Sequence, residues 1–231
     1  MPLLIGSLHS KYKFKPDHAE KWVRLAGKSD TLPFILEAAK QSAKTGFSFA
    51  DRAVACRFAS ELHAKAKKAG FSGDALSASL RYAEQAALLM ERPEHTNKDI
   101  LQDAKRQPFF IGLLAELSAA RAIDQVEGDD VDGKVLSYTQ KLLGTWELAQ
   151  LDRQTESWYE TDRLLQEVTL IYSGLKMAKQ VKSVAQDKDL VKTIDQRLKQ
   201  LRTVAERAVE TAPESRKESP TLGLREIQSI L

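Results

Sequence analysis

Apolar residues recur along the chain at intervals of three and four, and almost no segment alternates apolar and polar residues with a period of two. In residues 73–91 this stripe consists of Leu76, Leu80, Ala83, Ala87 and Met90. Similar stripes run through residues 49–69, 155–184 and 188–211. Such spacing places the apolar side chains on one face of an α-helix, and that face must be buried against another helix. The pattern therefore predicts an all-α protein.

Glycine, proline and capping residues divide the pattern into about eight helices. Gly70 and Gly73 bracket one corner, Pro93 ends a helix, and Asp187 is a suitable N-cap. The expected helices span residues 17–26, 31–44, 49–69, 73–91, 97–126, 131–152, 155–184 and 188–211. Pro108 lies inside the fifth of these, where it should kink or split the helix. We expect an antiparallel helical bundle.

The C-terminal residues differ in composition from the rest. The segment "TAPESRKESPT" at 211–221 has two prolines, several hydroxyl side chains and mixed charge, as linkers do. The apolar tail "LGLREIQSIL" that follows is shorter than the roughly 12 residues a helix needs alone in water, so it either packs on the body or awaits a partner. The expected divisions are an N-terminal extension at 1–16, a bundle at 17–211, with a hairpin part at about 50–125 and long helices over 131–211, and a flexible linker with a short tail at 212–231.

Composition limits the classes of function. The net charge is +3, from 35 Lys and Arg against 32 Asp and Glu, and the two signs alternate along most of the chain, which indicates no nucleic-acid partner. Cys56 is the only cysteine, so an intramolecular disulfide is excluded. The N-terminal run "MPLLIGSL" lacks the flanks of a secretory signal, and no apolar run reaches the length of a transmembrane segment. We expect a cytoplasmic protein. The sequence "KYKFK" at 11–15 leaves peripheral membrane contact open.

Residues for catalysis or metal binding do not stand at the required spacings. The four histidines are scattered, and neither His-Glu-x-x-His nor Cys-x-x-Cys occurs. The segment "AGKSD" at 26–30 resembles the end of a phosphate-binding loop, but Trp22 occupies the position of its first glycine. The sequence predicts no catalytic residue, no cofactor and no metal, which disfavours an enzyme without excluding one.

The hairpin at 63–92 carries a further pattern, in which an alanine-rich helix reaches an Ala-Gly-aromatic corner before a second helix begins. The matching residues are Ala69, Gly70, Phe71, Ala75, Leu76, Tyr82 and Ala86. Residues 50–125 thereby resemble MIT domains, the three-helix modules of endosomal-sorting and autophagy proteins, with residues 109–122 as the third helix. The chain departs from that family at 93–108, where the connection is longer, and at the extra Gly73. Tetratricopeptide hairpins share the corner, but no repeat with their 34-residue period follows.

This resemblance implies a non-enzymatic adaptor or scaffold that docks other proteins through helices, in membrane trafficking or autophagy. The docking residues expected on the hairpin are Leu76, Leu80 and Ala83. The apolar residues of the tail are further candidates, namely Leu222, Leu224, Ile227, Ile230 and Leu231. Burying three of these would contribute about 1.5–3 kcal/mol each, which suits a helix that docks into a groove.

Two other functions fit the same residues. An enzyme or a carrier of a small ligand or lipid could use an aromatic-lined pocket built from Trp146, Trp158, Tyr159 and Tyr172. A structural subunit of an oligomer could bury its exposed stripes against other chains. The segment 194–202 suits a coiled-coil seam, either within the chain or between two copies. The sequence leaves the partner and the oligomeric state open.

Overall fold

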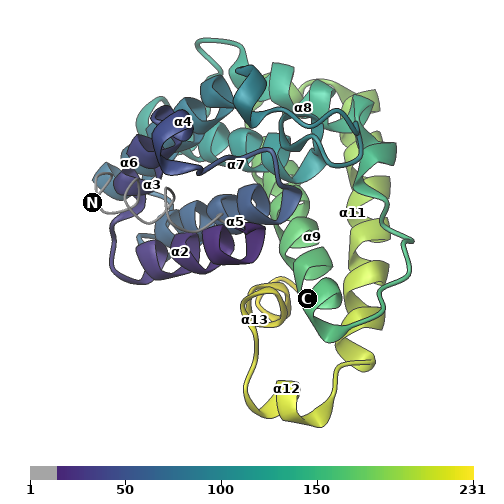
Figure 1. Ribbon diagram of the computed structural model, residues 1–231. Coiled ribbons are helices and arrows are strands. Elements are labelled where there is room, and N and C mark those ends of the chain that lie inside the picture. The colour runs from purple at the N-terminus through teal and green to yellow at the C-terminus, as the bar shows by residue number, and fades with distance from the viewer. Residues whose placement is uncertain (1–14) are drawn as a thin grey trace.

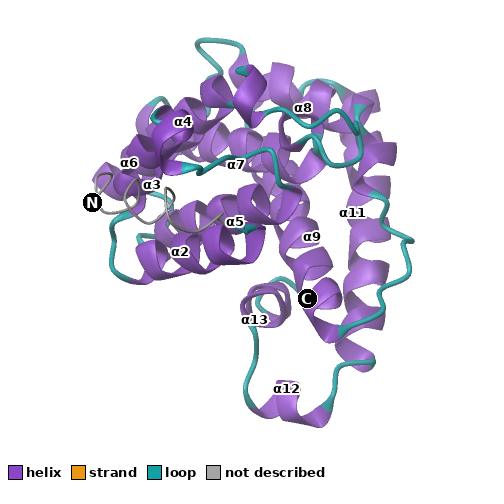
Figure 2. Ribbon diagram, viewed as in Figure 1, coloured by secondary structure: helices purple, strands orange, loops and turns teal. Residues whose placement is uncertain are grey.

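The computed structural model describes residues 15–231, and this part of the chain consists of helices and loops without a strand (Figure 2). The predicted all-α class is confirmed. A bundle of about eight helices is not, because the described residues form twelve α-helices and three short 3-10 helices. The α-helices are α2 (Pro16–Lys28), α3 (Leu32–Lys40), α4 (Ser42–Thr45), α5 (Arg52–Lys68), α6 (Gly73–Leu89), α7 (Pro108–Gln125), α8 (Lys134–Gly144), α9 (Trp158–Ala178), α10 (Lys182–Ala185), α11 (Lys188–Glu210), α12 (Glu214–Glu218) and α13 (Leu222–Gln228). The 3-10 helices are η1 (Pro93–His95), η2 (Ala104–Arg106) and η3 (Trp146–Ala149).

Helices α7 and α9 form the centre of the fold, and α5, α6, α8, α11 and α13 pack around them (Figure 1). The two central helices cross at a pair of glycines. A Cβ atom added to Gly174 would lie 2.4 Å from the carbonyl oxygen of Gly112, and one added to Gly112 would lie 2.8 Å from the carbonyl oxygen of Leu170. Both distances are too short for real side chains, so the two backbones approach as closely as they do because neither residue carries a Cβ.

The α5–α6 hairpin packs on α7, and its corner lies where the sequence predicts it. Gly70 and Gly73 both have positive φ angles, of 65° and 61°, which glycine adopts without steric cost. Helix α2 packs along α5, and α3 packs against α6. The hairpin therefore packs on α2, α3 and α7, and its buried side chains belong to one continuous core.

The predicted helix at 97–126 is wrong in its first third. Pro108 begins α7 at the first helical position instead of kinking a longer helix, because a residue there needs no partner for its backbone N–H. Residues 96–107 form loops and η2. Asn97, which the prediction places at the helix start, instead donates a side-chain hydrogen bond to the carbonyl oxygen of Ala50 at 3.1 Å. A loop side chain thus joins segments that are distant in sequence.

Two other predicted helices are shorter than expected. The helix at 131–152 begins at Lys134 and ends at Gly144, and η3 follows it. The helix at 155–184 begins only at Trp158, where the Ser157 side chain accepts a hydrogen bond from the backbone N–H of Glu160. It ends at Ala178, and the short α10 follows. The start of the last long helix is confirmed, since Asp187 caps α11 by accepting from the N–H of Leu190 at 3.0 Å.

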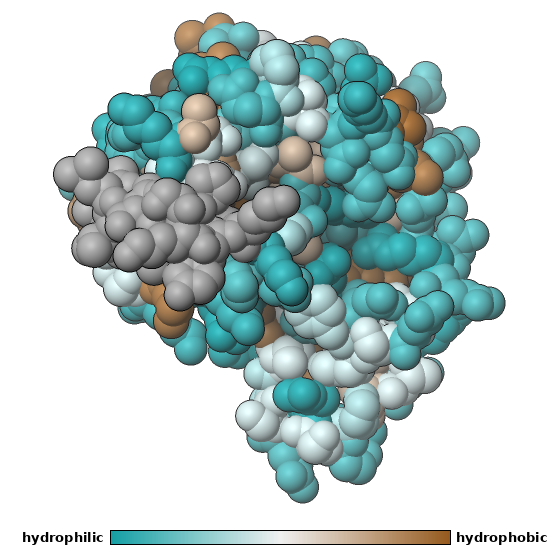
Figure 3. All heavy atoms as spheres, viewed as in Figure 1, coloured by the Kyte–Doolittle hydropathy of each residue, from teal (hydrophilic) through white to brown (hydrophobic). Residues whose placement is uncertain are grey.

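Helix α11 runs along the outside of the molecule against α9 (Figure 1). After it, the predicted linker contains the exposed helix α12, which extends away from the body before α13 returns to α9 (Figure 1). The surface in this view is mostly hydrophilic, with small separate hydrophobic patches (Figure 3). Of the predicted extension at 1–16, all but Lys15 and Pro16 lies outside the described residues.

Candidate functional site

The predicted docking stripe on the hairpin belongs to the core. Leu76 and Ala83 have no exposed surface, and Leu80 is 4% exposed. These side chains hold α6 against its neighbours, since they are part of the continuous core. Partner binding through them stays a prediction, but on the folded chain they offer no surface to a partner.

The predicted C-terminal docking helix packs on the body of the same chain. Leu224 and Ile227 of α13 are buried, while Leu222, Ile230 and Leu231 are partly exposed. The contact with α9 is close at Gly223, where an added Cβ would lie 2.2 Å from the carbonyl oxygen of Asp162. The sequence left open whether the tail packs on the body, and the structure shows that it does.

Polar contacts hold this tail at three points. The carboxylate of Asp162 accepts hydrogen bonds from the hydroxyl of Thr221 and from the backbone N–H of Leu224, the latter at 3.2 Å. Lys67 of α5 pairs with Glu226 at 2.6 Å. The guanidinium of Arg202 on α11 donates to the backbone carbonyl of Leu231 at 2.9 Å. The tail thereby joins α5, α9 and α11.

The four aromatic residues of the predicted pocket do not line one cavity. Tyr159 and Tyr172 stand thirteen residues apart on α9, which is about 20 Å along a helix. The Tyr159 hydroxyl bonds to Glu20, and its ring lies under the guanidinium of Arg163. Lys176 lies over the ring of Tyr172. Trp158 is partly buried beside Tyr159, and Trp146 lies in η3. A shared ligand pocket among them stays a prediction, which this arrangement does not favour.

The described residues contain no cluster of metal ligands, and Cys56 is buried. No cluster of three or more His, Cys, Asp or Glu residues there could hold a metal ion. Burial raises the pKa of the Cys56 thiol well above its ordinary value, so the thiol stays protonated and unreactive. Among the described helices, none combines the length and the apolar character needed to span a membrane.

Charged side chains buried near the centre of the fold pair with each other. Glu167 of α9 is 1% exposed and accepts two hydrogen bonds from the Arg52 guanidinium, at 2.7 and 2.9 Å. Arg153 donates to the same carboxylate at 2.9 Å, and Arg52 also donates to the carbonyl oxygen of Leu101. This cluster fastens α5, α9 and two loops to one another. Two guanidiniums share the one buried carboxylate, and the contacts that they make to distant segments indicate a structural role.

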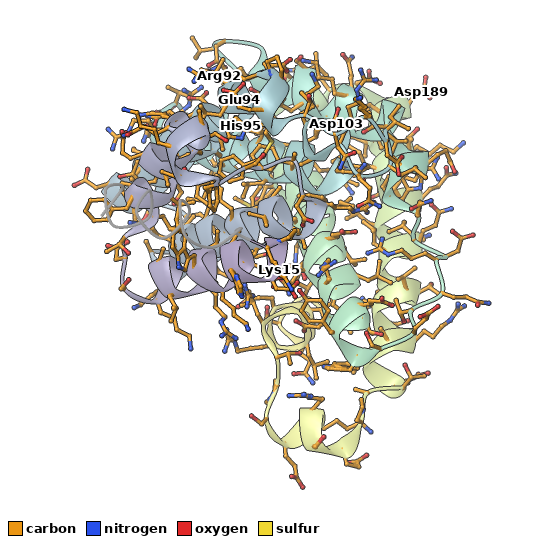
Figure 4. The ribbon with its side chains drawn as sticks, viewed as in Figure 1. Lys15, Arg92, Glu94, His95, Asp103 and Asp189 are labelled. Atoms are coloured by element: carbon orange, nitrogen blue, oxygen red, sulfur yellow. The ribbon has the colours of Figure 1, made fainter. Side chains whose placement is uncertain are left out.

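Positive charge is concentrated in the segment that leads from the end of α9 through α10 into the outer helix α11. Residues 176–207 contain nine Lys and Arg against four Asp and Glu, a net charge of +5, and α11 alone has six against four, a net charge of +2. Lys188, Lys192 and Lys199 lie within about 40° of each other around the α11 axis. All three are exposed and pair with no described carboxylate. We call these three residues the α11 lysine stripe. Asp189, beside the first of them, marks the N-terminal end of α11, on the opposite side of the view from His95 (Figure 4).

Sequence reasoning missed this stripe because it judged charge over the whole chain. A charge count over windows of about thirty residues would have revealed it, since the rest of the chain is nearly neutral. The helical pattern would then have placed the three lysines on one face, opposite the buried residues Ile194 and Leu201.

A depression lies between η3 and one flank of α11. It has a volume of about 490 Å³. Its lining includes the two arginines Arg197 and Arg207, the two carboxylates of Glu147 and Asp152, and Trp146. The guanidinium carbon of Arg197 lies 4.6 Å from the centroid of the Trp146 ring. We call this feature the Trp146–Arg197 depression.

Comparison with family models identifies the family of the chain, which the side chains described above do not reveal. The chain matches the family model of Mrp13, described as mitochondrial ribosomal protein mS27, over residues 1–229. No curated protein matches it.

This match corrects several predictions. The resemblance of residues 50–125 to MIT domains is wrong, because one ribosomal family accounts for nearly the whole chain. Alanine-rich helices that meet at a glycine corner occur wherever helices pack closely, so that signal was too general. An adaptor in trafficking or autophagy is therefore wrong, and the alternative of a structural subunit agrees better with the family.

The predicted location and partners are also wrong. A single cysteine fits any reducing compartment, so it could not distinguish the cytoplasm from the mitochondrial matrix to which the family points. The exclusion of nucleic acid rested on overall charge balance, whereas a ribosomal protein belongs to a particle of RNA and protein. Because the match covers residues 1–229, the chain belongs to the Mrp13 family, mitochondrial ribosomal protein mS27.

Proposed function

We propose that the chain is a non-catalytic structural subunit of the small subunit of the mitochondrial ribosome, and that it binds ribosomal RNA through the α11 lysine stripe. The observation that carries the proposal is the family match over residues 1–229.

The α11 lysine stripe is suited to the phosphate backbone of RNA. Its lysines are separated by four and seven residues, or about 6 and 10 Å along the helix. They project from the side of α11 opposite its buried face, so one RNA strand could contact all three without displacing any part of the body. Such contacts give affinity without sequence specificity, and they release counterions.

The test is the triple substitution Lys188→Glu, Lys192→Glu and Lys199→Glu, followed by sedimentation of the tagged chain with mitochondrial small ribosomal subunits. We expect the triple variant to shift from the ribosomal fractions to the free pool. The matched control is Lys44→Glu, Arg81→Glu and Lys98→Glu, which changes the charge equally at exposed positions on other elements. This control should sediment as the parent does.

A direct RNA-binding measurement complements the sedimentation test. If each lysine contacts one phosphate of a single strand, the slope of log affinity against log salt should fall in magnitude by about 0.7 for each lysine removed. An unchanged slope, together with normal sedimentation of the triple variant, would overturn RNA binding by this face.

The division at about residue 211 is part of the same proposal. We propose that residues 17–211 form the body bound to the ribosome and that residues 212–221 act as a linker around the exposed α12. Residues 213–220 are all exposed, which supports this division. Limited trypsin digestion should cut first at Arg216 and Lys217, and first cuts inside 17–211 would contradict it.

A further inference from the structure

We infer that the Trp146–Arg197 depression holds one unstacked, amino-bearing base of single-stranded RNA, that is, adenine, guanine or cytosine rather than uracil. This inference rests on the proposed function, because it places the base next to a strand that the α11 lysine stripe contacts. The site would distinguish one base from another, whereas the lysine stripe contacts only phosphates and binds RNA without sequence specificity.

The first step concerns location. Arg197, Gln200, Thr203, Val204 and Arg207 supply the α11 side of the depression, and they follow one flank of the helix that carries the lysine stripe. Lys199 precedes Gln200 directly and lies on the neighbouring, exposed face. A strand that follows the stripe therefore passes the mouth of the depression, and one turned-out base reaches it without a second binding surface.

The second step concerns the stacking surface. The guanidinium of Arg197 lies on the indole of Trp146, and its Nη1 atom donates to the side-chain oxygen of Gln200 at 2.9 Å. These two contacts hold the guanidinium over the Trp146 ring, and the same side chain lines the depression, where it is available for a base to stack on. Unstacked bases in RNA complexes commonly stack on arginine planes of this kind.

The third step concerns the chemistry of the lining. Glu147 and Asp152 are exposed on the rim, and no ion pair joins either of them to Arg197 or Arg207. Two carboxylates beside the guanidiniums of Arg197 and Arg207 leave the lining without net charge, which suits an uncharged base edge better than a phosphate. The carboxylates accept hydrogen bonds from the exocyclic amino groups of adenine, guanine and cytosine, whereas uracil offers only its N3–H between two carbonyl oxygens that a carboxylate repels. The lining thus favours a base edge over a phosphate and discriminates against uracil.

The experiment measures binding of the full chain to single-stranded oligoadenylate, oligocytidylate and oligouridylate of equal length by fluorescence anisotropy. We expect oligoadenylate and oligocytidylate to bind more tightly than oligouridylate. Arg197→Lys keeps the charge but removes the plane, so it should weaken oligoadenylate binding about fivefold or more. The slope of affinity against salt should stay the same, since the number of charges does not change.

Two further variants keep the inference falsifiable. Arg81→Lys is the matched control, because Arg81 also lies over an aromatic ring, that of Tyr82, but on α6. It should leave all three affinities unchanged. The exposed pair Glu147→Gln and Asp152→Asn should reduce the preference for oligoadenylate over oligouridylate without loss of folding, even if Arg197→Lys lowers thermal stability.

The outcomes separate this inference from the proposed function. Equal binding of the three oligonucleotides, with loss only in the lysine-stripe variant, would overturn the base site and leave RNA binding intact. Failure of the parent chain to bind any oligonucleotide would count against both. If Arg197→Lys leaves RNA binding unchanged but releases the chain from small subunits, the depression binds a ribosomal protein, and the base site is overturned.

Discussion

The Nδ1 atom of His63 lies 2.8 Å from Oε2 of Glu116, and both side chains are almost completely buried. His63 belongs to α5 and Glu116 to α7, so the pair joins the hairpin to the central helix. On its other side, Nε2 of His63 lies 3.8 Å from Glu226 of α13. Two carboxylates thus face one imidazole across three helices. This arrangement makes the protonation state of His63 a determinant of stability.

His63 should stabilise the fold in its charged form. Burial alone would lower the pKa of His63, but the charge and hydrogen bond of Glu116, with the charge of Glu226, outweigh burial and raise it. A raised pKa in the folded state gives stability that is fully present below about pH 6.5 and is lost as pH rises through the folded value. The denaturant concentration at the midpoint of unfolding should therefore decrease as the pH rises above about 6.5. His63→Gln should make this midpoint less dependent on pH over the same range. An identical slope in the variant would contradict the prediction.

His95 should act in the opposite direction. Its Nδ1 accepts from the backbone N–H of Phe49 at 3.2 Å, and its Nε2 lies 3.1 Å from the carbonyl oxygen of Ala39, a pattern that requires the neutral ring. Burial lowers its pKa. The free energy of unfolding should decrease as the pH falls below about 6.5, because the His95 imidazole then binds a proton in the unfolded chain but not in the folded chain. His95→Gln should remove that acid-side slope while the His63 slope remains.

Gly223→Ala should detach the C-terminal helix. An added Cβ would meet the backbone carbonyl of Asp162 at 2.2 Å, and this carbonyl cannot move without distorting α9. We expect a loss of about 1–3 kcal/mol and faster hydrogen exchange at the Leu224 amide. Gly144→Ala is the control, because nothing lies within 4 Å of that position. It should leave exchange in the tail unchanged, and equal exchange in the two variants would contradict close packing at Gly223.

Glu167→Gln should be among the most damaging single substitutions in the body. It leaves the guanidiniums of Arg52 and Arg153 without their shared countercharge in a buried position. Breaking such a pair from one side costs about 3–5 kcal/mol. The exposed pair of Arg202 and Glu206 offers a control, since Glu206→Gln should cost less than about 1 kcal/mol. Similar urea midpoints for both variants would show that Glu167 is better solvated than its burial indicates.

Local sequence signals predicted much of the helical fold. Asp187 marked the start of α11, and the spacing of Leu76, Leu80 and Ala83 marked the buried face of α6. Pro108 was misjudged because a proline has opposite effects at the first turn and in the interior of a helix, and the pattern alone did not fix where the helix began. The predictions were therefore best where a cap and a periodic stripe agreed.

The candidate sites were less predictable because they depend on contacts between distant segments. Asp162 holds the tail from about sixty residues away in sequence, and nothing near either segment signals that contact. The pairing of Trp146 with Arg197 likewise arises only when η3 and α11 are brought together. The lysine stripe was accessible from sequence, but only by measuring charge locally.

The closure of α13 on the body also bears on how the chain folds. Lys67 and Glu226 are separated by 159 residues, so their contact closes a loop that spans most of the chain. Residues 222–231 follow α5 and α9 along the chain, so the contacts of α13 with these helices can form only after the residues between them have been made. Long-range contacts of this kind form late and slow folding. A chain from which residues 222–231 are missing therefore lacks the contacts that fasten α13 to α5 and α9.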